Sequence, residues 1–252
     1  MSFDVAAEAY DRFMGRYSRL LSPQMADLGA VAPGQRVLDV GCGPGALTAE
    51  LVRRVGPEQV TAVDPSEPFV HAARERFPGL DVRRGTAEAL PFDDNAFDAA
   101  IAQLVVHFMT DPVAGIREMA RVTRPGGVVA ACVWDHAHGT GPVSLFWEAV
   151  ARVEPDAENE AGLAGSAPGD LVEILGAAGL RDVEGSVVVA DLEHASFEGW
   201  WEPYTLGVGP AGKYIKHADP TRVEAIRDVA RELTGPPPFT IEARAWAARG
   251  MV

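Results

Sequence analysis

Residues 37–45 read Val37-Leu38-Asp39-Val40-Gly41-Cys42-Gly43-Pro44-Gly45, a short apolar strand that leads directly into three closely spaced glycines. The residues that follow, 46–55, have the apolar spacing of a helix. Glycine permits positive φ angles and allows a ligand to approach the backbone closely. The unpaired amides and the positive end of the helix meet at the same turn, which therefore suits a carboxylate or a phosphate. The alternative is an ordinary tight turn, for which one glycine suffices.

The strand and helix around this turn are the first of several such pairs. We expect further strands at residues 60–63, 80–83, 96–102 and 128–133, and helices at residues 68–76 and 113–122. Strands that alternate with helices predict a parallel sheet, covered by helices on both faces and connected by right-handed crossovers. Residues 31–135 are thus expected to form a ligand-binding core.

Two segments are expected to elaborate this core within a single domain of residues 1–252. Residues 1–30 form an N-terminal helical cap, with helical stretches at 6–17 and 20–28 and a break or new start at Ser22-Pro23. Helices at 146–152 and 169–178 precede two alternating strands at 183–192 and 239–247. The long connection between those strands, residues 193–238, is expected to be a lid or a binding surface.

Composition excludes several classes of function. The net charge of −14 would repel a phosphate backbone, so we expect no nucleic-acid partner. No apolar stretch approaches the roughly 18 residues that span a bilayer, and the first residues lack the pattern of a signal peptide. The two cysteines, Cys42 and Cys132, make neither a disulfide framework nor a zinc site, and the six histidines show no metal spacing. We expect a soluble cytoplasmic protein without a metal or a membrane partner; the sequence indicates no oligomeric state.

Residues 39–45 resemble the first motif of the class I S-adenosylmethionine-dependent methyltransferases, an apolar residue followed by Leu-Asp-x-Gly-x-Gly-x-Gly. The resemblance implies a Rossmann-like α/β fold, whose mostly parallel seven-stranded sheet has the order 3-2-1-4-5-7-6. It also implies that Asp39 holds the ammonium of S-adenosylmethionine, directly or through water. The turn that would surround the amino-acid portion consists of Gly41, Cys42, Gly43, Pro44 and Gly45. In a dinucleotide-binding fingerprint the third glycine comes one residue later, so the spacing favours the methyl donor.

A second motif, Val63-Asp64-Pro65-Ser66, ends the next strand. The resemblance assigns the ribose hydroxyls of the cofactor to Asp64, with Pro65 and Ser66 beside it. By itself, an aspartate before a proline is more often a signal for the start of a helix.

A third motif, the loop Gly85-Thr86-Ala87-Glu88-Ala89-Leu90-Pro91-Phe92, is similar to the loop after the third strand in the quinone-biosynthesis-like subgroup of this family. In that subgroup an acidic residue meets the adenine amino group, and here Thr86 occupies the acidic position. The adenine contact is therefore assigned to Thr86, to the backbone at Ala87 or to Glu88.

The segment after the fourth strand lies where open α/β folds bind their ligands, at the carboxyl end of the sheet. We expect Gln103 to line the cofactor site and His107 to face the acceptor, where an imidazole is suited to act as a base. The alternative for His107 is a hydrogen-bonded packing residue among its apolar neighbours. His136 and His138 are weaker candidates.

Aromatic residues outside the core supply the candidate acceptor site. Residues 9–18 are similar to a segment that closes over the cofactor in a methyltransferase subfamily, so Tyr10 and Arg16 are candidate cap residues; the alternative is an aromatic stripe packed on the sheet. A second group offers apolar area for an acceptor or forms the insertion's own small core, and comprises Phe146, Trp147, Trp200, Trp201 and Tyr204.

The motifs together predict methyl transfer from S-adenosylmethionine to an oxygen, nitrogen or carbon of a small, largely apolar acceptor. The chemistry is an in-line displacement, which requires alignment more than it requires a base. The alternative is a non-catalytic module or regulator that binds the same cofactor, suggested by the lack of an unambiguous base. A nicotinamide-dependent oxidoreductase comes third, because the glycine spacing disfavours it.

Overall fold

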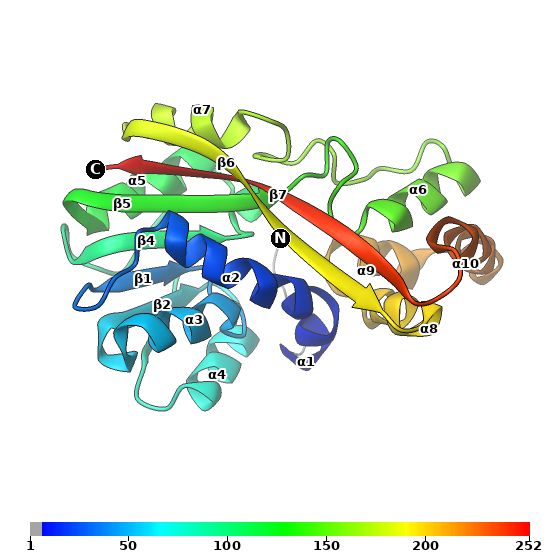
Figure 1. Cartoon of the computed structure of the whole chain (residues 1–252), viewed down its shortest axis with the longest axis horizontal. Helices are drawn as coiled ribbons and strands as arrows, with labels where there is room; N and C mark the ends of the chain where they lie inside the picture. Colours follow the sequence, from blue (N-terminus) through cyan, green and yellow to red (C-terminus); the bar gives the residue numbers. More distant parts are fainter. Residues whose placement is uncertain (1–6) are drawn as a thin grey trace.

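A seven-stranded sheet forms the centre of the computed structural model, which describes residues 7–252 (Figure 1). Its strand order is β3-β2-β1-β4-β5-β7-β6. The strands are β1 (Val37–Val40), β2 (Val60–Asp64), β3 (Asp81–Arg84), β4 (Phe97–Gln103), β5 (Thr123–Trp134), β6 (Arg181–His194) and β7 (Phe239–Met251). The first five pair in parallel, and β7 runs antiparallel to both β5 and β6. The predicted fold class and strand order are confirmed.

Helices cover both faces of this sheet. The chain forms α1 (Ala7–Tyr10), α2 (Arg16–Leu28), α3 (Ala46–Val55), α4 (Glu67–Arg76), α5 (Pro112–Val122), α6 (Ser144–Val153), α7 (Asp170–Ala177), α8 (Phe197–Trp201), α9 (Gly209–His217) and α10 (Pro220–Thr234). Single turns of other helical types lie at Asp11–Gly15, Pro57–Gln59, Val106–Phe108 and Glu202–Leu206. Apolar side chains of α2, α3 and α4 pack on one face of the sheet, and those of α5 and α7 pack on the other. Burial on both faces explains why β1 is apolar at almost every position.

The N-terminal segment differs from the expectation. Helix α2 continues through Pro23, and the irregular turn is instead the π-helical segment Asp11–Gly15. The predicted break at Ser22-Pro23 is therefore wrong. Pro23 cannot donate to the carbonyl of Arg19, but both residues lie on the exposed side of α2, where solvent can satisfy such a carbonyl. The first helical stretch was expected to begin at residue 6, which lies outside the described residues.

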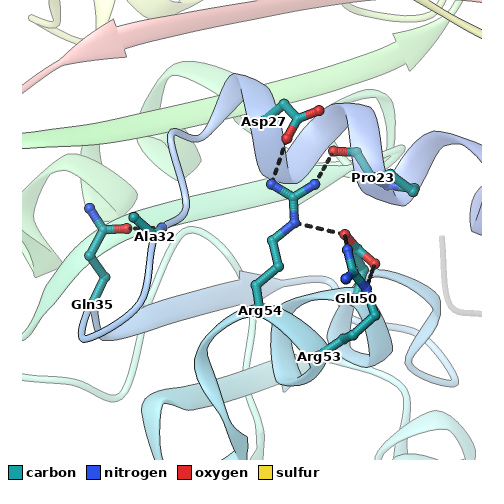
Figure 2. A network of polar contacts seen from close by, with 7 residues as sticks. All are labelled: Pro23, Asp27, Ala32, Gln35, Glu50, Arg53 and Arg54. Carbon is teal, nitrogen blue, oxygen red and sulfur yellow. Dashed lines mark hydrogen bonds and ion pairs between the residues drawn. The ribbon is translucent and has the colours of Figure 1, made fainter.

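An arginine of α3 holds α2 in place. The guanidinium of Arg54 donates to Asp27 Oδ1 at 2.6 Å and to the carbonyl of Pro23 at 2.8 Å, both on α2 (Figure 2). It also donates to Oε1 of Glu50, one helical turn earlier, at 2.7 Å. These charge-assisted bonds add to the apolar packing between α2 and α3.

The connection between β6 and β7 contains α8, α9 and α10. Together with α6 these helices gather at one end of the sheet, beyond the other strands, where β6 and β7 extend toward them (Figure 1). Glu198 of α8 pairs with two arginines of α10, Arg227 at 2.6 Å and Arg231 at 2.9 Å. The predicted insertion is therefore a packed helical layer.

Within residues 7–252, no helix has the length and apolar character needed to cross a membrane. The same part of the chain contains no group of three or more His, Cys, Asp or Glu side chains that could hold a metal ion. Cys42 and Cys132 are both buried thiols.

Backbone conformation explains the glycines of the first turn. Gly41, Gly43 and Gly45 have φ angles of 72°, 54° and 98°, a region that side chains with a Cβ atom adopt at a cost. A Cβ atom on Gly41 would overlap Val105, whereas one on Gly43 would meet no atom within 4 Å. Position 41 therefore needs glycine because of its positive φ angle and because of the space that Val105 occupies. Position 43 needs glycine because of its φ angle alone.

This difference predicts unequal effects of two equivalent substitutions. We expect Gly43→Ala to lower the free energy of unfolding by about 1–2 kcal/mol, the cost of the left-handed backbone alone. Gly41→Ala should cost a further 1–3 kcal/mol or so, because Val105 must move. Urea denaturation of both variants beside the unmodified protein measures the difference; equal losses would contradict this account of the turn.

Candidate active site

A cavity of about 380 Å³, which we name the main cavity, lies at the carboxyl ends of β1, β2 and β4. Every segment that the sequence singled out for cofactor binding contributes to its wall. The predicted residues that line it are Tyr10, Gly41, Gly43, Asp64, Pro65, Ser66, Thr86, Ala87, Glu88 and Gln103. The volume is in the range of small-molecule sites. Cys42 and Pro44 lie behind this wall and border a smaller pocket, while Gly45 precedes α3.

Asp64 connects the first turn to the end of β2. Its Oδ2 accepts a hydrogen bond from the amide of Gly43 at 2.8 Å, and its Oδ1 accepts one from the amide of Ser66 at 2.8 Å. Each oxygen keeps a second lone pair for a ligand hydroxyl. Burial raises the pKa of Asp64 to about 6, although the two amide bonds act in the opposite direction. A carboxylate held in this way is a preformed acceptor at the cavity wall.

Asp39 is more deeply buried. Its Oδ2 accepts a hydrogen bond of 2.6 Å from the hydroxyl of Thr48 on α3. Burial raises the pKa of Asp39 to about 7, and the nearby charge of Asp64 raises it further in the same direction. Asp39 borders a pocket of about 20 Å³, which is room for about one water molecule and which it shares with Gly41 and Gln103. We therefore expect Asp39 to contact a ligand in the main cavity through a water molecule and not directly.

Gln103 places an acceptor at the boundary of these two cavities. Its Nε2 donates to the carbonyl of Ser18 on α2 at 3.0 Å, and a carbonyl can only accept, so the orientation of the amide is fixed. The opposite atom, Oε1, is buried and has no partner among residues 7–252. Leaving a buried acceptor unpaired costs about 1–3 kcal/mol, so this position suits a ligand that brings an N–H donor.

A second, inner pocket of about 40 Å³ adjoins the main cavity and shares Tyr10, Leu104 and Phe108 with it. Its walls are mainly apolar, and its polar lining residues are His107, His136 and Glu160. The ring centroids of the two histidines are 6.0 Å apart. We name this space the inner pocket.

His107 lines this pocket and is only 8% exposed, and its role as a base stays a prediction. Its Nδ1 has no hydrogen-bond partner among the described residues. Burial, and then the proximity of His136, hold the pKa of His107 well below its usual range. Burial likewise lowers the pKa of His136 to about 4. Both rings are therefore neutral near pH 7 and carry no positive charge into the pocket.

Glu160 is a residue that the sequence did not single out. It lies in a polar segment rich in Ala, Gly and Glu, where no periodic pattern separates one glutamate from its neighbours. The structure buries it in the wall of the inner pocket, with its Oε2 accepting a hydrogen bond of 2.7 Å from the indole of Trp147. The position of Glu160 depends on tertiary contacts, and no pattern in the neighbouring residues predicts it.

Arg16 does not reach either cavity. Its Nη1 donates to the carbonyl of Gly199 in α8 at 3.2 Å, so it ties the N-terminal segment to the insertion. The expectation that Arg16 touches the cofactor is corrected by this placement. Tyr10, from the same segment, lines both the main cavity and the inner pocket.

The aromatic residues of the insertion also differ from the first expectation. Phe146, Trp200, Trp201 and Tyr204 are buried and line neither the main cavity nor the inner pocket. Phe146 and Tyr204 stack with ring centroids 4.6 Å apart, and Trp200 packs against Tyr204 at 5.1 Å. These rings form a core between α6 and the insertion, as in the second interpretation. Trp147 borders a separate, open basin.

Known proteins with similar sequences are methyltransferases. A family model described as a methyltransferase domain matches residues 38–131. A demethylmenaquinone methyltransferase of Renibacterium salmoninarum is 35% identical over 163 residues, which are 62% of this chain and 67% of that protein. The chain belongs to the class I methyltransferase family. An uncharacterized methyltransferase of Mycobacterium tuberculosis is 39% identical over 135 residues, or 54% of this chain. The matched stretch spans 52% of that relative, about half its length.

Solved structures support the methyltransferase fold. A putative methyltransferase from an antibiotic biosynthesis pathway of Anabaena variabilis has a TM-score of 0.62 at 17% identity, with 94% of this chain and 100% of that chain covered. The [4+2]-cyclase SpnF has a TM-score of 0.57 at 24% identity, with 92% and 81% covered. At these identities the likeness concerns the fold alone. Because one of these proteins is named a cyclase, the reaction must be argued from the site.

The burial of Asp39 predicts a pH-dependent cost to stability. Its pKa is about 7 in the folded protein and near 3.9 in an unfolded chain, so between these values the folded state binds more protons. The free energy of unfolding therefore falls as the pH rises through this range. We expect Asp39→Asn to lessen the loss of stability between about pH 5 and pH 8 by roughly 1–4 kcal/mol. Urea denaturation at both pH values checks this, with Asp228→Asn on the exposed side of α10 as control. A slope unchanged by Asp39→Asn would contradict the assignment.

Proposed function

We propose that this protein transfers the methyl group of S-adenosylmethionine to a small, largely apolar acceptor. The observation that carries the proposal is the junction of two cavities. One is bordered by all three cofactor motifs, and the other is a mainly apolar pocket that shares Tyr10, Leu104 and Phe108 with it. A donor in the first cavity and an acceptor in the second would meet at these three residues.

Family membership supports both halves of the proposal. Class I methyltransferases generally use S-adenosylmethionine, and two relatives have small apolar acceptors in their names. One is the demethylmenaquinone methyltransferase described above. The other is a chloroplastic 2-methyl-6-phytyl-1,4-hydroquinone methyltransferase of Oryza sativa subsp. japonica, 35% identical over 151 residues that are 59% of this chain and 40% of that protein.

The residues of the main cavity match the parts of this cofactor. The free lone pairs of Asp64 suit the two ribose hydroxyls, since a carboxylate accepts from both. Thr86, the backbone at Ala87 and Glu88 all line the cavity and suit the adenine edge; Oε1 of Glu88 accepts from the amide of Thr110 at 2.7 Å. The unpaired Oε1 of Gln103 suits the ammonium, with Asp39 behind it through water.

Bound S-adenosylmethionine supplies a methyl group on a sulfonium, which is already an activated leaving group. The chain has to align the acceptor with that methyl group and exclude water, and alignment of this kind is worth up to about 7–11 kcal/mol. Leu104 and Phe108 provide an apolar surface at the junction, and Tyr10 covers it from the N-terminal segment.

The N-terminal cap of residues 1–30 and the insertion of residues 193–238 are proposed to act as a joint lid over both cavities. Four contacts connect them in the described part of the chain. Arg12 pairs with Glu202 at 2.8 Å, and Arg16 donates to Gly199. The ring of Phe13 packs on that of Tyr204 at 4.9 Å, and the hydroxyl of Tyr17 hydrogen-bonds His194 at 2.9 Å. Movement of the lid is expected to admit ligands, because the inner pocket is small when these contacts are formed.

The cofactor assignment predicts a charge-dependent affinity. Asp64→Asn keeps the size of the side chain but removes the charge that the ribose hydroxyls would meet, so binding of S-adenosylhomocysteine should weaken by about 1–3 kcal/mol. Asp228→Asn, on the exposed face of α10, should leave the affinity unchanged. Isothermal titration calorimetry measures both. Absence of binding to the unmodified protein at millimolar ligand would remove the proposal, and tight binding without transfer of labelled methyl to any acceptor pool would remove its catalytic part.

A further inference from the structure

A third cavity continues the series formed by the main cavity and the inner pocket. It is an open basin of about 600 Å³, bordered by α6, by α9 and by the segment that carries Glu160. The basin shares Glu160 and Pro210 with the inner pocket, just as the inner pocket shares Tyr10 with the main cavity. The three spaces are therefore neighbours in a row, and the residues that they share lie between them. Glu160 lies between the inner pocket and the basin, a position that we call the neck.

The carboxylate of Glu160 is available at this neck. The residue is 7% exposed, and its Oε2 is held by the indole of Trp147 at 2.7 Å. Its Oε1 has no hydrogen-bond partner within residues 7–252. Burial raises the pKa of Glu160 to about 7, while the bond from Trp147 lowers it. The unused oxygen is not among the buried atoms without a partner, and Glu160 lines two cavities, so a ligand there can bring it a donor or a positive charge.

The charges and aromatic rings around the inner pocket favour a ligand that carries a positive charge. No lysine or arginine lines it, and its two histidines are neutral near pH 7 for the reasons given above. Its aromatic lining residues are Tyr10, Phe13, Phe108 and Trp134. Aromatic faces attract cations, and a carboxylate adds to this attraction. An acceptor that must become an oxyanion would find no positive side chain here.

The other titratable groups near Glu160 do not neutralise its negative charge. The titratable groups of the inner pocket are Tyr10, His107 and His136, and Tyr204 lies near Glu160 outside the pocket. On the side of the basin they are Glu154, Glu158, Lys213, Tyr214, His217 and Arg222. Glu154 is satisfied by Arg222 at 2.8 Å and by the hydroxyl of Tyr214 at 2.6 Å. Lys213 is exposed to solvent, which screens its charge.

We propose that the acceptor is an amine on a small apolar body, that it enters through the open basin, and that Glu160 binds its ammonium group and takes one proton from it. This inference rests on the proposed function and names its substrate class. Glu160 is thus the residue that selects a basic nitrogen over a hydroxyl or a carbon nucleophile.

The step balances in protons and electrons. One N–H bond of the ammonium breaks, its proton passes to the Glu160 carboxylate, and the electron pair stays on nitrogen. That pair forms the new N–C bond, while the C–S bond breaks with its pair going to sulfur, which becomes a neutral thioether. The product leaves as a methylated ammonium ion, and Glu160 then releases its proton to water.

Two binding measurements test the proposal, with 2-phenylethylamine as the amine and 4-ethylphenol as a neutral probe of similar shape. Both are titrated at about pH 8 into protein saturated with S-adenosylhomocysteine. Glu160→Gln should weaken amine binding about tenfold or more and leave 4-ethylphenol unaffected. Glu148→Gln, an exposed glutamate on α6 that pairs with Arg152, is the matched control and should change neither. Affinity for S-adenosylhomocysteine in each variant reports that the fold is intact.

The pH dependence of amine affinity shows whether the charge of Glu160 binds the amine or whether Glu160 has only a structural role. Amine affinity of the unmodified protein should rise as the pH passes through about 7, because Glu160 loses its proton there. Trp147→Phe removes a bond that lowers the pKa of Glu160, so the rise should move to higher pH. In Glu160→Gln the rise should be absent.

Three results would overturn the proposal: equal amine affinity in Glu160→Gln, no amine binding while S-adenosylhomocysteine binds, or a preference for 4-ethylphenol or a naphthoquinol as methyl acceptor. The last two leave the proposed function standing. Amine binding that depends on Glu160 in a protein that fails to bind S-adenosylhomocysteine would instead support the amine site and remove the proposed function.

Discussion

The contact between the first glycine turn and Asp64 is the interaction on which the rest of the site depends. The amide of Gly43 can reach Asp64 only because the turn adopts positive φ angles, and the amides of Gly41 and Cys42 bond the carbonyl of Val63 at 2.7 and 3.0 Å. These bonds join the ends of β1 and β2 at one edge of the sheet. The main cavity is the space that these bonds leave open, and it is bounded by Gln103 at the end of β4 and by Tyr10 of α1.

Buried acids give this edge a second common property. Burial raises the pKa values of Asp39, Asp64 and Glu160 to about 7, 6 and 7, so each carboxylate is held where ionisation opposes stability in the absence of a ligand. Asp64 lines the main cavity, Asp39 borders the small pocket next to it, and Glu160 lines the inner pocket. Within the described residues, none of the three carboxylates pairs with a lysine or an arginine. Such carboxylates lower the stability of the ligand-free protein and strengthen the binding of ligands that bring hydroxyl groups, ammonium groups or a sulfonium.

The sequence predicted the parts of the structure that arise from local pattern. Strand and helix alternation predicted β1 to β5 within a residue or two at most boundaries, and the glycine turn with Asp64 predicted one wall of the cavity. The exceptions depend on tertiary contacts. Pro23 continues α2 because the burial of Leu21 and Met25 holds the helix on the sheet and Arg19 faces solvent. Trp200 and Tyr204 became core residues because α6 folds back onto them, and Glu160 gained its position from an irregular segment. The neighbouring residues in the sequence predict neither of these positions.

We propose that methyl transfer takes place at the junction of the main cavity and the inner pocket. A crystal structure of the protein with S-adenosylhomocysteine bound tests this proposal most directly. We expect Asp64 to accept from both ribose hydroxyls and Gln103 Oε1 to accept from the ammonium, and we expect the sulfur to face the inner pocket between Tyr10, Leu104 and Phe108. A sulfur atom that faces away from these three residues, or a ribose without contact to Asp64, would contradict it.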